Sequence, residues 1–346
     1  MTLLPRTTAL FASVSLVAVL SLCAPVFAAP ARPDPSAKKV AILIFDNVQV
    51  IDYSGPLEVF SDAGFDVFTV AATKNPVTTA AGDAVKLTPK YTFADAPQAD
   101  LVVIPGGGFE AAKDSATVAW IKRENEHAEH TMSVCNGAFT LANTGLLDGL
   151  TATTTAGNIN RLRRTYPAIK VVGDRRVVDN GKILTTAGLS AGIDGALHMV
   201  DVMKGDGEGQ SVALQIEYDW RPDGHYVRGA MADSLIPSLS GRLAIGDEFD
   251  VKLSGDDDQW RTRAWYTTKL TPAEVLAALT AAYEKAYASD GPWAPGSFHT
   301  ESGGPLAANI RFDDRHGQHW KGAVSVDPID GDAHKVAVQI AIDREG

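Results

Sequence analysis

The chain has 346 residues, of which 45% are hydrophobic and 21% charged, a composition typical of a globular protein and unlike disordered, collagen-like or coiled-coil chains. Thirty-one Lys and Arg against 42 Asp and Glu give a net charge of −11 at pH 7. Because an acidic surface repels phosphate backbones, we expect no nucleic-acid partner. The two cysteines exclude a disulfide framework.

Residues 1–28 have the features of an export signal. Arg6 gives a positive start, an apolar run follows, and Ala28 ends a small-residue motif of the kind that signal peptidase cleaves. The run is short for a membrane span and is interrupted by Pro25. We therefore expect cleavage after Ala28, a periplasmic or secreted protein, and no stable membrane insertion afterwards. A lipidated Cys23 and an uncleaved anchor are the alternatives.

Between residues 38 and 204, short apolar runs alternate with helix-like segments. Strands are expected at 40–45, 66–71, 101–104, 131–134, 170–172, 176–178 and 182–185, and helices at 56–63, 117–128, 137–145, 158–166 and 190–203. This alternation predicts a doubly wound α/β domain of flavodoxin-like type, with a mostly parallel sheet and helices on both faces.

The pattern changes after residue 204. Residues 205–218 begin with a glycine-rich stretch and are predicted to be a linker. Residues 219–346 hold five of the six tryptophans and are predicted to be a small α+β module of unknown role. Its expected elements are a strand at 262–268, a helix from 271 to about 287, and strands at 308–312, 322–326 and 335–342.

After cleavage, Cys135 is the only cysteine of the mature chain, and it lies where an apolar strand gives way to a helix. Such a nucleophile elbow projects its side chain at the carboxyl edge of the sheet, where ligands bind. We expect the helix N-terminus to lower the pKa of the thiol. The alternative is a buried structural cysteine, but the elbow context favours a functional one.

Two further segments are candidates to meet Cys135 at this edge of the sheet. The glycines of residues 104–109 follow a strand, and their backbone N–H groups are suited to hold an anion, although the loop is also a plausible plain turn. Asp52 follows an apolar stretch, ahead of a helix predicted to begin at Pro56. A partly buried, protonated Asp52 would hydrogen-bond to a thiolate, and its alternative role is a helix cap.

The order and spacing of several short motifs are specific. They comprise residues 40–45, 52–60, 104–107, 133–139, 145–149, 184–188 and 192–194. With them, residues 39–203 resemble the ThiJ/PfpI family of the class I glutamine-amidotransferase-like superfamily, nearest the branch of isocyanide hydratases and of sensor domains in transcription activators. A sensor of transcription is disfavoured, because the chain has an export signal and no DNA-binding motif.

The resemblance implies roles for four residues. Cys135 would be the nucleophile, Asp52 the acid that shuttles a proton, and Gly107 and Asn136 the backbone donors to the developing anion. It also implies a homodimer. We expect a small-molecule substrate and no cofactor or metal. In the hydratase branch, the thiolate attacks an electrophilic carbon, a thioimidate forms, and water releases an N-substituted formamide.

The sequence departs from the family pattern at two positions. Asn136 stands where the hydratase branch typically has threonine and the protease-like branch has histidine, and Thr155 stands where many relatives have histidine. Two hypotheses follow. In one, Cys135 and Asp52 alone hydrate or hydrolyse a small carbon–nitrogen electrophile. In the other, the site binds a small molecule without turnover, or Cys135 is oxidised as a redox response.

Overall fold

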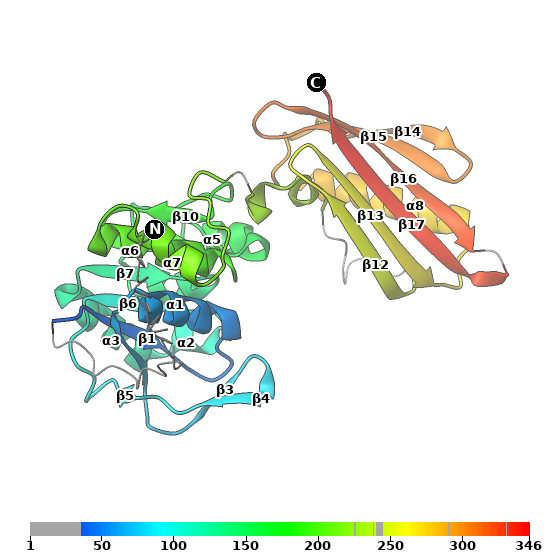
Figure 1. Cartoon of the computed structure of the whole chain (residues 1–346). Helices are drawn as coiled ribbons and strands as arrows, with labels where there is room; N and C mark the ends of the chain where they lie inside the picture. The colour runs from blue at the N-terminus through cyan, green and yellow to red at the C-terminus, as the bar shows by residue number, and fades with distance from the viewer. Residues whose placement is uncertain (1–35, 225, 238, 240–244, 290, 330) are drawn as a thin grey trace, which may run out of the picture. The chain divides into compact units, whose positions relative to one another are not determined.

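The computed structural model describes residues 36–346 except 225, 238, 240–244, 290 and 330 (Figure 1). The predicted signal segment, including Cys23, lies outside the described residues. Within the described part of the chain, no helix combines the length and the apolar character that a membrane span requires. The α/β domain and the C-terminal module each have their own sheet and are described in turn.

The α/β domain is built on a seven-stranded sheet. In spatial order its strands are β10 (Val177–Asp179), β11 (Ile183–Thr186), β7 (His130–Ser133), β6 (Leu101–Ile104), β1 (Lys39–Leu43), β2 (Asp66–Ala71) and β5 (Tyr91–Thr92). All neighbouring pairs are parallel except β10 with β11, which form the expected hairpin. The mostly parallel sheet is as predicted.

Helices cover both faces of this sheet because its central strands are apolar on both sides (Figure 1). In β1, Val40 and Ile42 face one core, whereas Ala41 and Leu43 face the other. The first core is closed by α1 (Val50–Asp62), α6 (Ala191–Lys204) and α7 (Glu208–Gln215), and the second by α2 (Glu110–Lys113), α3 (Ser115–His127), α4 (Gly137–Ala142) and α5 (Ile159–Thr165). The predicted doubly wound architecture is confirmed.

The domain also contains several smaller elements. They are the hairpin of β3 (Val77–Thr79) and β4 (Gly82–Leu87), the parallel pair β8 (Thr151–Ala152) and β9 (Lys170–Val171), and the 3₁₀ turn η1 (Ala156–Asn158). The sequence pattern did not indicate β3, β4, β5 or β8, because such short, partly exposed strands have no apolar periodicity of their own.

The start predicted for the helix that carries Asp52 is wrong. We expected the helix to begin at Pro56, because proline favours the first helical position, but α1 begins at Val50 and contains Pro56. The chain enters it from a bridge between Val48 and Gly107. Asp52 consequently lies in the first turn of a helix rather than in a loop.

The stretch predicted to be a linker contains α7. Val212 and Ala213 of this helix are buried in the same core as α1 and α6, and Trp220 joins them from beyond the helix. The glycine-rich residues that suggested a linker form the short turn between α6 and α7.

The C-terminal module is an antiparallel sheet packed against one helix, which confirms the predicted additional α+β module. In spatial order the strands are β12 (Asp247–Gly255), β13 (Gln259–Thr267), β17 (Asp332–Arg344), β16 (His319–Ile329), β15 (Ala307–Asp313) and β14 (His299–Gly304). Helix α8 (Pro272–Tyr287) begins at a capping box in which Thr271 and Glu274 bond reciprocally. The 3₁₀ turns η2 (Arg228–Ala230) and η3 (Ala232–Leu235) precede the sheet.

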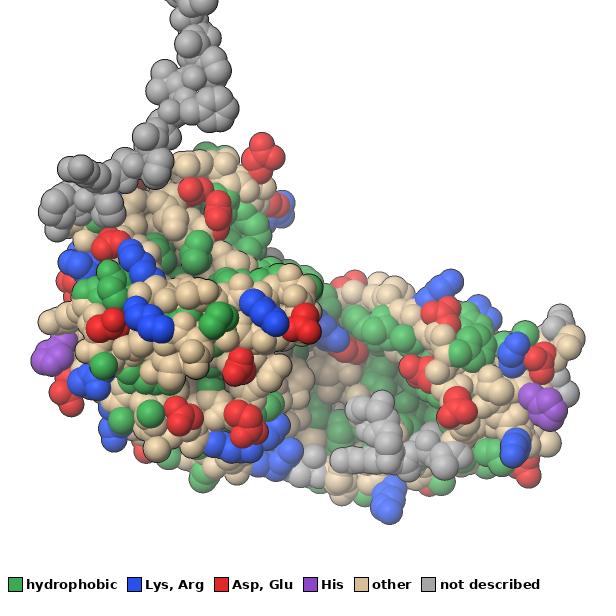
Figure 2. Space-filling view, turned by 90° about the horizontal axis from the view of Figure 1, so that it is seen from below, with side chains coloured by type: hydrophobic (Ala, Val, Ile, Leu, Met, Phe, Trp, Pro, Cys, Tyr) green, Lys and Arg blue, Asp and Glu red, His purple; other side chains and the backbone are tan. Residues whose placement is uncertain are grey.

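Charges of both signs are mixed on the surface. Among the described residues on the face in Figure 2, Lys and Arg side chains alternate with Asp and Glu side chains. This face therefore presents no continuous basic track of the kind that holds a phosphate backbone.

Candidate functional site

Cys135 occupies a strained turn between β7 and α4. Its φ of 56° lies in the left-handed region, which a cysteine adopts only at a cost. The turn is held by two hydrogen bonds: the Cys135 N–H donates to Ala187 O at 3.1 Å, and Thr154 Oγ1 donates to Cys135 O at 2.8 Å. Gly137, the first residue of α4, suits this close approach because a Cβ at its position would lie 2.2 Å from Ile104 O. The predicted elbow is therefore present, with Cys135 half-buried.

Asp52 is brought to the elbow by the pairing of two loops. The Gln49 N–H donates to Gly106 O, and the Gly108 N–H donates to Asn47 O, both at 2.9 Å. One turn of α1 later, the Asp52 side chain is fully buried, and its Oδ2 accepts a hydrogen bond of 3.1 Å from the Gly106 N–H. Its other oxygen, Oδ1, has no well-formed hydrogen bond among the described residues, which leaves it available to a proton from the thiol.

Gly106 sits at the centre of the site. A Cβ at this position would lie 2.3 Å from Asn136 Oδ1, 2.7 Å from Asp52 Oδ2 and 2.8 Å from Cys135 Cβ. Three side chains from two separate segments, α1 and the elbow at Cys135 and Asn136, therefore converge on a space that only glycine leaves open. The sequence placed Gly106 in a motif but gave no sign of this role.

Burial dominates the electrostatics of the pair. It raises the pKa of Asp52 to about 6, against the lowering effect of the Gly106 hydrogen bond and of the nearby Cys135 and Leu189 donors, whose contacts are not well-formed hydrogen bonds. Burial, followed by the nearby Asp52 charge, raises the pKa of Cys135 to about 12. The expectation that the helix N-terminus lowers the thiol pKa is therefore wrong, because desolvation outweighs the donors. At neutral pH the thiol keeps its proton and Asp52 is charged, which reverses the expected arrangement.

Thr155 lies beside the Cys135 sulfur. Its hydroxyl is hydrogen-bonded to Cys135, and together with the backbone N–H of Asn136 it lowers the pKa of the thiol. A Cβ on Gly188 would lie 2.6 Å from Thr155 Oγ1 and 3.4 Å from Cys135 Sγ, so this second glycine also leaves room for the site. Thr155 thus supplies a hydroxyl, and no titratable base, beside the thiol.

The Gly107 N–H is already paired. It donates to Asn136 Oδ1 at 2.7 Å, and Asn136 Nδ2 donates back to Gly107 O at 2.7 Å. The prediction that Gly107 offers a free donor to the reacting atoms is therefore not met in this arrangement. The Asn136 backbone N–H, by contrast, is hydrogen-bonded to the Cys135 sulfur, and its role as a donor to the developing anion stays a prediction. These two hydrogen bonds require an asparagine after the cysteine. The sequence showed that residue but gave no reason for it.

The described residues around Cys135 include no group of metal ligands. Within the described ranges, no three His, Cys, Asp or Glu side chains are grouped so as to hold a metal ion. The groups that meet at the site are a thiol, a carboxyl group, a hydroxyl and backbone N–H groups.

Comparison with known proteins supports this reading of the domain. Residues 38–202 match the DJ-1/PfpI family. The chain is 35% identical over 185 residues to the isonitrile hydratase of Pseudomonas putida, which covers 53% of this chain and 79% of that protein. The chain belongs to the DJ-1/PfpI family.

Other members of the DJ-1/PfpI family are also similar. The crystal structure of a ThiJ/PfpI family protein from Pseudomonas syringae has a TM-score of 0.50 and 30% sequence identity, and covers 59% of this chain and 86% of that one. A putative cysteine protease, YraA of Bacillus subtilis, is 28% identical over 116 residues, or 33% of this chain and 69% of that protein. The family match ends at residue 202, before the C-terminal module.

Proposed function

We propose that the protein is a cysteine-dependent hydratase that adds water to the carbon of an isocyanide. The observation that carries the proposal is the convergence of the Cys135 thiol and the buried Asp52 carboxylate, with Gly106 leaving the space between them. The similarity to an isonitrile hydratase supports the substrate class. An isocyanide suits a buried, uncharged thiol because it is small, neutral and able to accept both sulfur and a proton at one carbon.

The steps balance with these residues alone. Asp52 takes the proton of the Cys135 thiol as the sulfur attacks the terminal carbon, and then gives that proton to the same carbon, which leaves a thioimidate. Water adds across the carbon–nitrogen double bond, with its hydroxyl on carbon and its proton on nitrogen. The carbon–sulfur bond then breaks, the hydroxyl proton returns to the sulfur, and an N-substituted formamide leaves.

Positioning groups assist the attack without titrating. The Thr155 hydroxyl and the Asn136 backbone N–H both stabilise negative charge on the sulfur while its proton is on Asp52. The Asn136 side chain holds the 106–107 loop in place through its two bonds to Gly107. No histidine is needed for any step.

The test is an assay of residues 29–346 on a panel of alkyl and aryl isocyanides, with formamide measured by mass spectrometry. We expect turnover by the wild type, no detectable turnover by Cys135→Ala, and a loss of at least about 100-fold in Asp52→Asn, the usual scale for a general acid–base group. Gly106→Ala should lose activity as well, whereas Gly157→Ala, at a glycine with open space around it, should retain it.

Absence of formamide with every isocyanide and every variant would overturn the proposal. Mild peroxide treatment followed by mass spectrometry then tests the redox alternative. Oxidation requires the thiolate, which the raised thiol pKa disfavours, so we expect Cys135 to be oxidised no faster than a thiol in a short peptide.

We also propose that the protein works outside the cytoplasm, in the periplasm or the medium. The charge and apolar pattern of residues 1–28 supports this location. A site whose thiol stays protonated also suits an oxidising compartment, because a protonated thiol resists disulfide exchange.

A further inference from the structure

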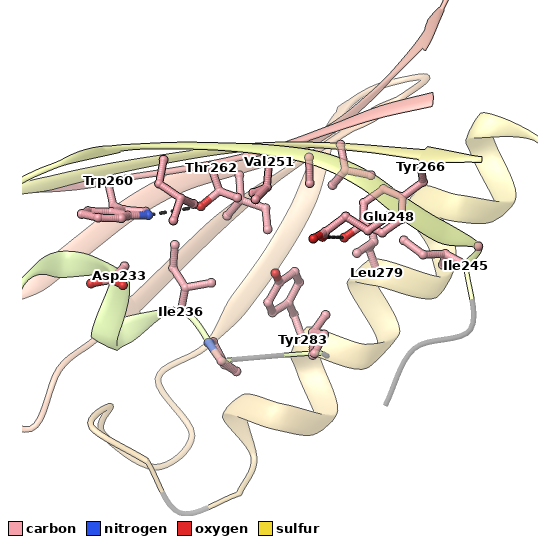
Figure 3. Close-up of a pocket in the computed structure, with 17 residues that line it drawn as sticks. Asp233, Ile236, Ile245, Glu248, Val251, Trp260, Thr262, Tyr266, Leu279 and Tyr283 are labelled. Atoms are coloured by element: carbon pink, nitrogen blue, oxygen red, sulfur yellow. Dashed lines mark hydrogen bonds between the residues drawn. The ribbon is translucent and has the colours of Figure 1, made fainter. Parts of the chain in front are cut away.

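The C-terminal module contains a cavity of about 570 Å³ between its sheet and its helix (Figure 3). This volume lies in the range of sites for small molecules. Side chains of β13 and β17 form its roof and α8 forms its floor, and the apolar wall consists of Val251, Leu253, Ala264, Val338, Ile340 and Leu279. The cavity is open to solvent along β12, where the apolar side chains of Val251 and Leu253 are exposed.

One polar group in the cavity lacks a partner. Tyr283 of α8 is only 5% exposed, and its hydroxyl points toward the sheet in Figure 3. No described residue is hydrogen-bonded to this hydroxyl. The hydroxyl oxygen is not sealed inside the protein but reachable from the cavity, so a ligand there can bond to it.

A carboxylate lies at the same end of the cavity. Glu248 of β12 accepts a hydrogen bond of 2.9 Å from the Tyr266 hydroxyl, and both side chains line the cavity. Burial together with Glu248 raises the pKa of Tyr266 to about 12, so Tyr266 stays neutral and donates. No described Lys, Arg or His side chain forms an ion pair with Glu248. Glu248 is exposed, so its charge lies at the solvent-open edge of the cavity without a cation, whereas Asp233, which also lines the cavity, is paired with Arg228.

We propose that this cavity binds a small apolar amine, with its ammonium group between the Glu248 carboxylate and the Tyr283 hydroxyl. The hydrocarbon body lies against Ala264, Val338 and Leu279. An ammonium group donates to both oxygens and neutralises the carboxylate, whereas an alcohol has a single proton to donate and a fatty acid brings a second negative charge. The net charge of −11 also favours a cationic ligand.

The experiment is isothermal titration of residues 29–346 with n-octylamine, 1-octanol and octanoate at neutral pH. We expect octylamine to bind at least about tenfold more tightly than octanol, because its hydrogen bond to Glu248 is charged and that of octanol is neutral. Octanoate should not bind. Glu248→Gln should bring octylamine down to the level of octanol. Tyr283→Phe should weaken octylamine and leave the melting temperature unchanged or raised.

The matched control is Asp250→Asn, which removes the same charge from the same strand. Asp250 is paired with Trp265 on the other side of the sheet and does not line the cavity. We expect Asp250→Asn and Cys135→Ala to bind octylamine like the wild type, which separates this site from the catalytic proposal. Equal weakening by Asp250→Asn and Glu248→Gln would reveal attraction by net charge alone and overturn the proposal. Octanoate that binds as tightly as octylamine would overturn it too.

Discussion

Asp52 and Cys135 share one proton at neutral pH, and burial decides where it stays. Both groups are desolvated, but the thiol also faces the Asp52 charge, so its pKa rises to about 12 whereas that of Asp52 rises only to about 6. A thiol that is a weak acid at rest needs a base at the moment of attack. In the proposed mechanism the Asp52 carboxylate is that base, and Thr155 and the Asn136 N–H lower the energy of the sulfur anion that results.

The pH dependence of turnover follows from this arrangement. If charged Asp52 is the base, kcat/KM for an isocyanide should fall about tenfold for each pH unit below about 6 and stay level above it. A free thiolate as the resting nucleophile would instead make kcat/KM rise steadily through pH 8 and above. Stopped assays from about pH 4.5 to 9, with far-ultraviolet circular dichroism to confirm folding at each pH, distinguish the two profiles.

At the scale of elements, the sequence predicted what apolar periodicity controls. The buried strands β1, β2, β6 and β7 and the elbow at Cys135 were foreseen, because each is a run of apolar residues followed by a turn. The approach of Asp52 to Cys135 was predicted only as a possibility, since it depends on pairing between residues 47–49 and 106–108. Pairing of this kind joins segments more than fifty residues apart and leaves no local signal.

The two errors at the site have the same origin. The lowered thiol pKa was inferred from the helix N-terminus alone, and the free Gly107 donor from its place in a glycine-rich loop. Burial and the Asn136 side chain reversed these inferences, and both act across space rather than along the chain. Gly106 and Gly188 were likewise visible in the sequence, but their function as points of close approach required coordinates.

Helix α7 offers a test at this scale, because two neighbouring apolar residues face opposite ways. Val212 is 5% exposed and packs in the core with α1 and α6, whereas Leu214 is 72% exposed. Val212→Asp should lower the free energy of unfolding by about 3 kcal/mol or more, since it buries an unpaired charge. Leu214→Asp should change it by about 0.5 kcal/mol at most. Urea unfolding followed by circular dichroism measures both, and similar values for the two variants would show that α7 does not belong to the core.

At the scale of the whole molecule, the chain combines a DJ-1/PfpI domain with a second module that has its own core. The core of the module joins α8 to the strands through Val275, Leu279, Val324 and Val338. The domain holds the Cys135 thiol beside Asp52, and the module holds an apolar cavity with a carboxylate at its edge. Two separate sites in one chain allow each proposal to fail without affecting the other.

Export concerns the whole chain, and the sequence predicts it. Expressed with its own N-terminus in a bacterial host, the protein should be recovered from the periplasmic or medium fraction beginning at Ala29. Intact-mass analysis should show the loss of residues 1–28 and nothing added. Arg6→Glu removes the positive start of the signal and should shift the protein toward the cytoplasmic fraction with its N-terminus uncleaved. The control, Arg32→Glu, changes a residue beyond the cleavage point and should be exported and cleaved like the wild type. A chain that begins at Cys23 and carries the added mass of a lipid would instead identify a lipoprotein, and a full-length chain in the membrane fraction would identify an uncleaved anchor.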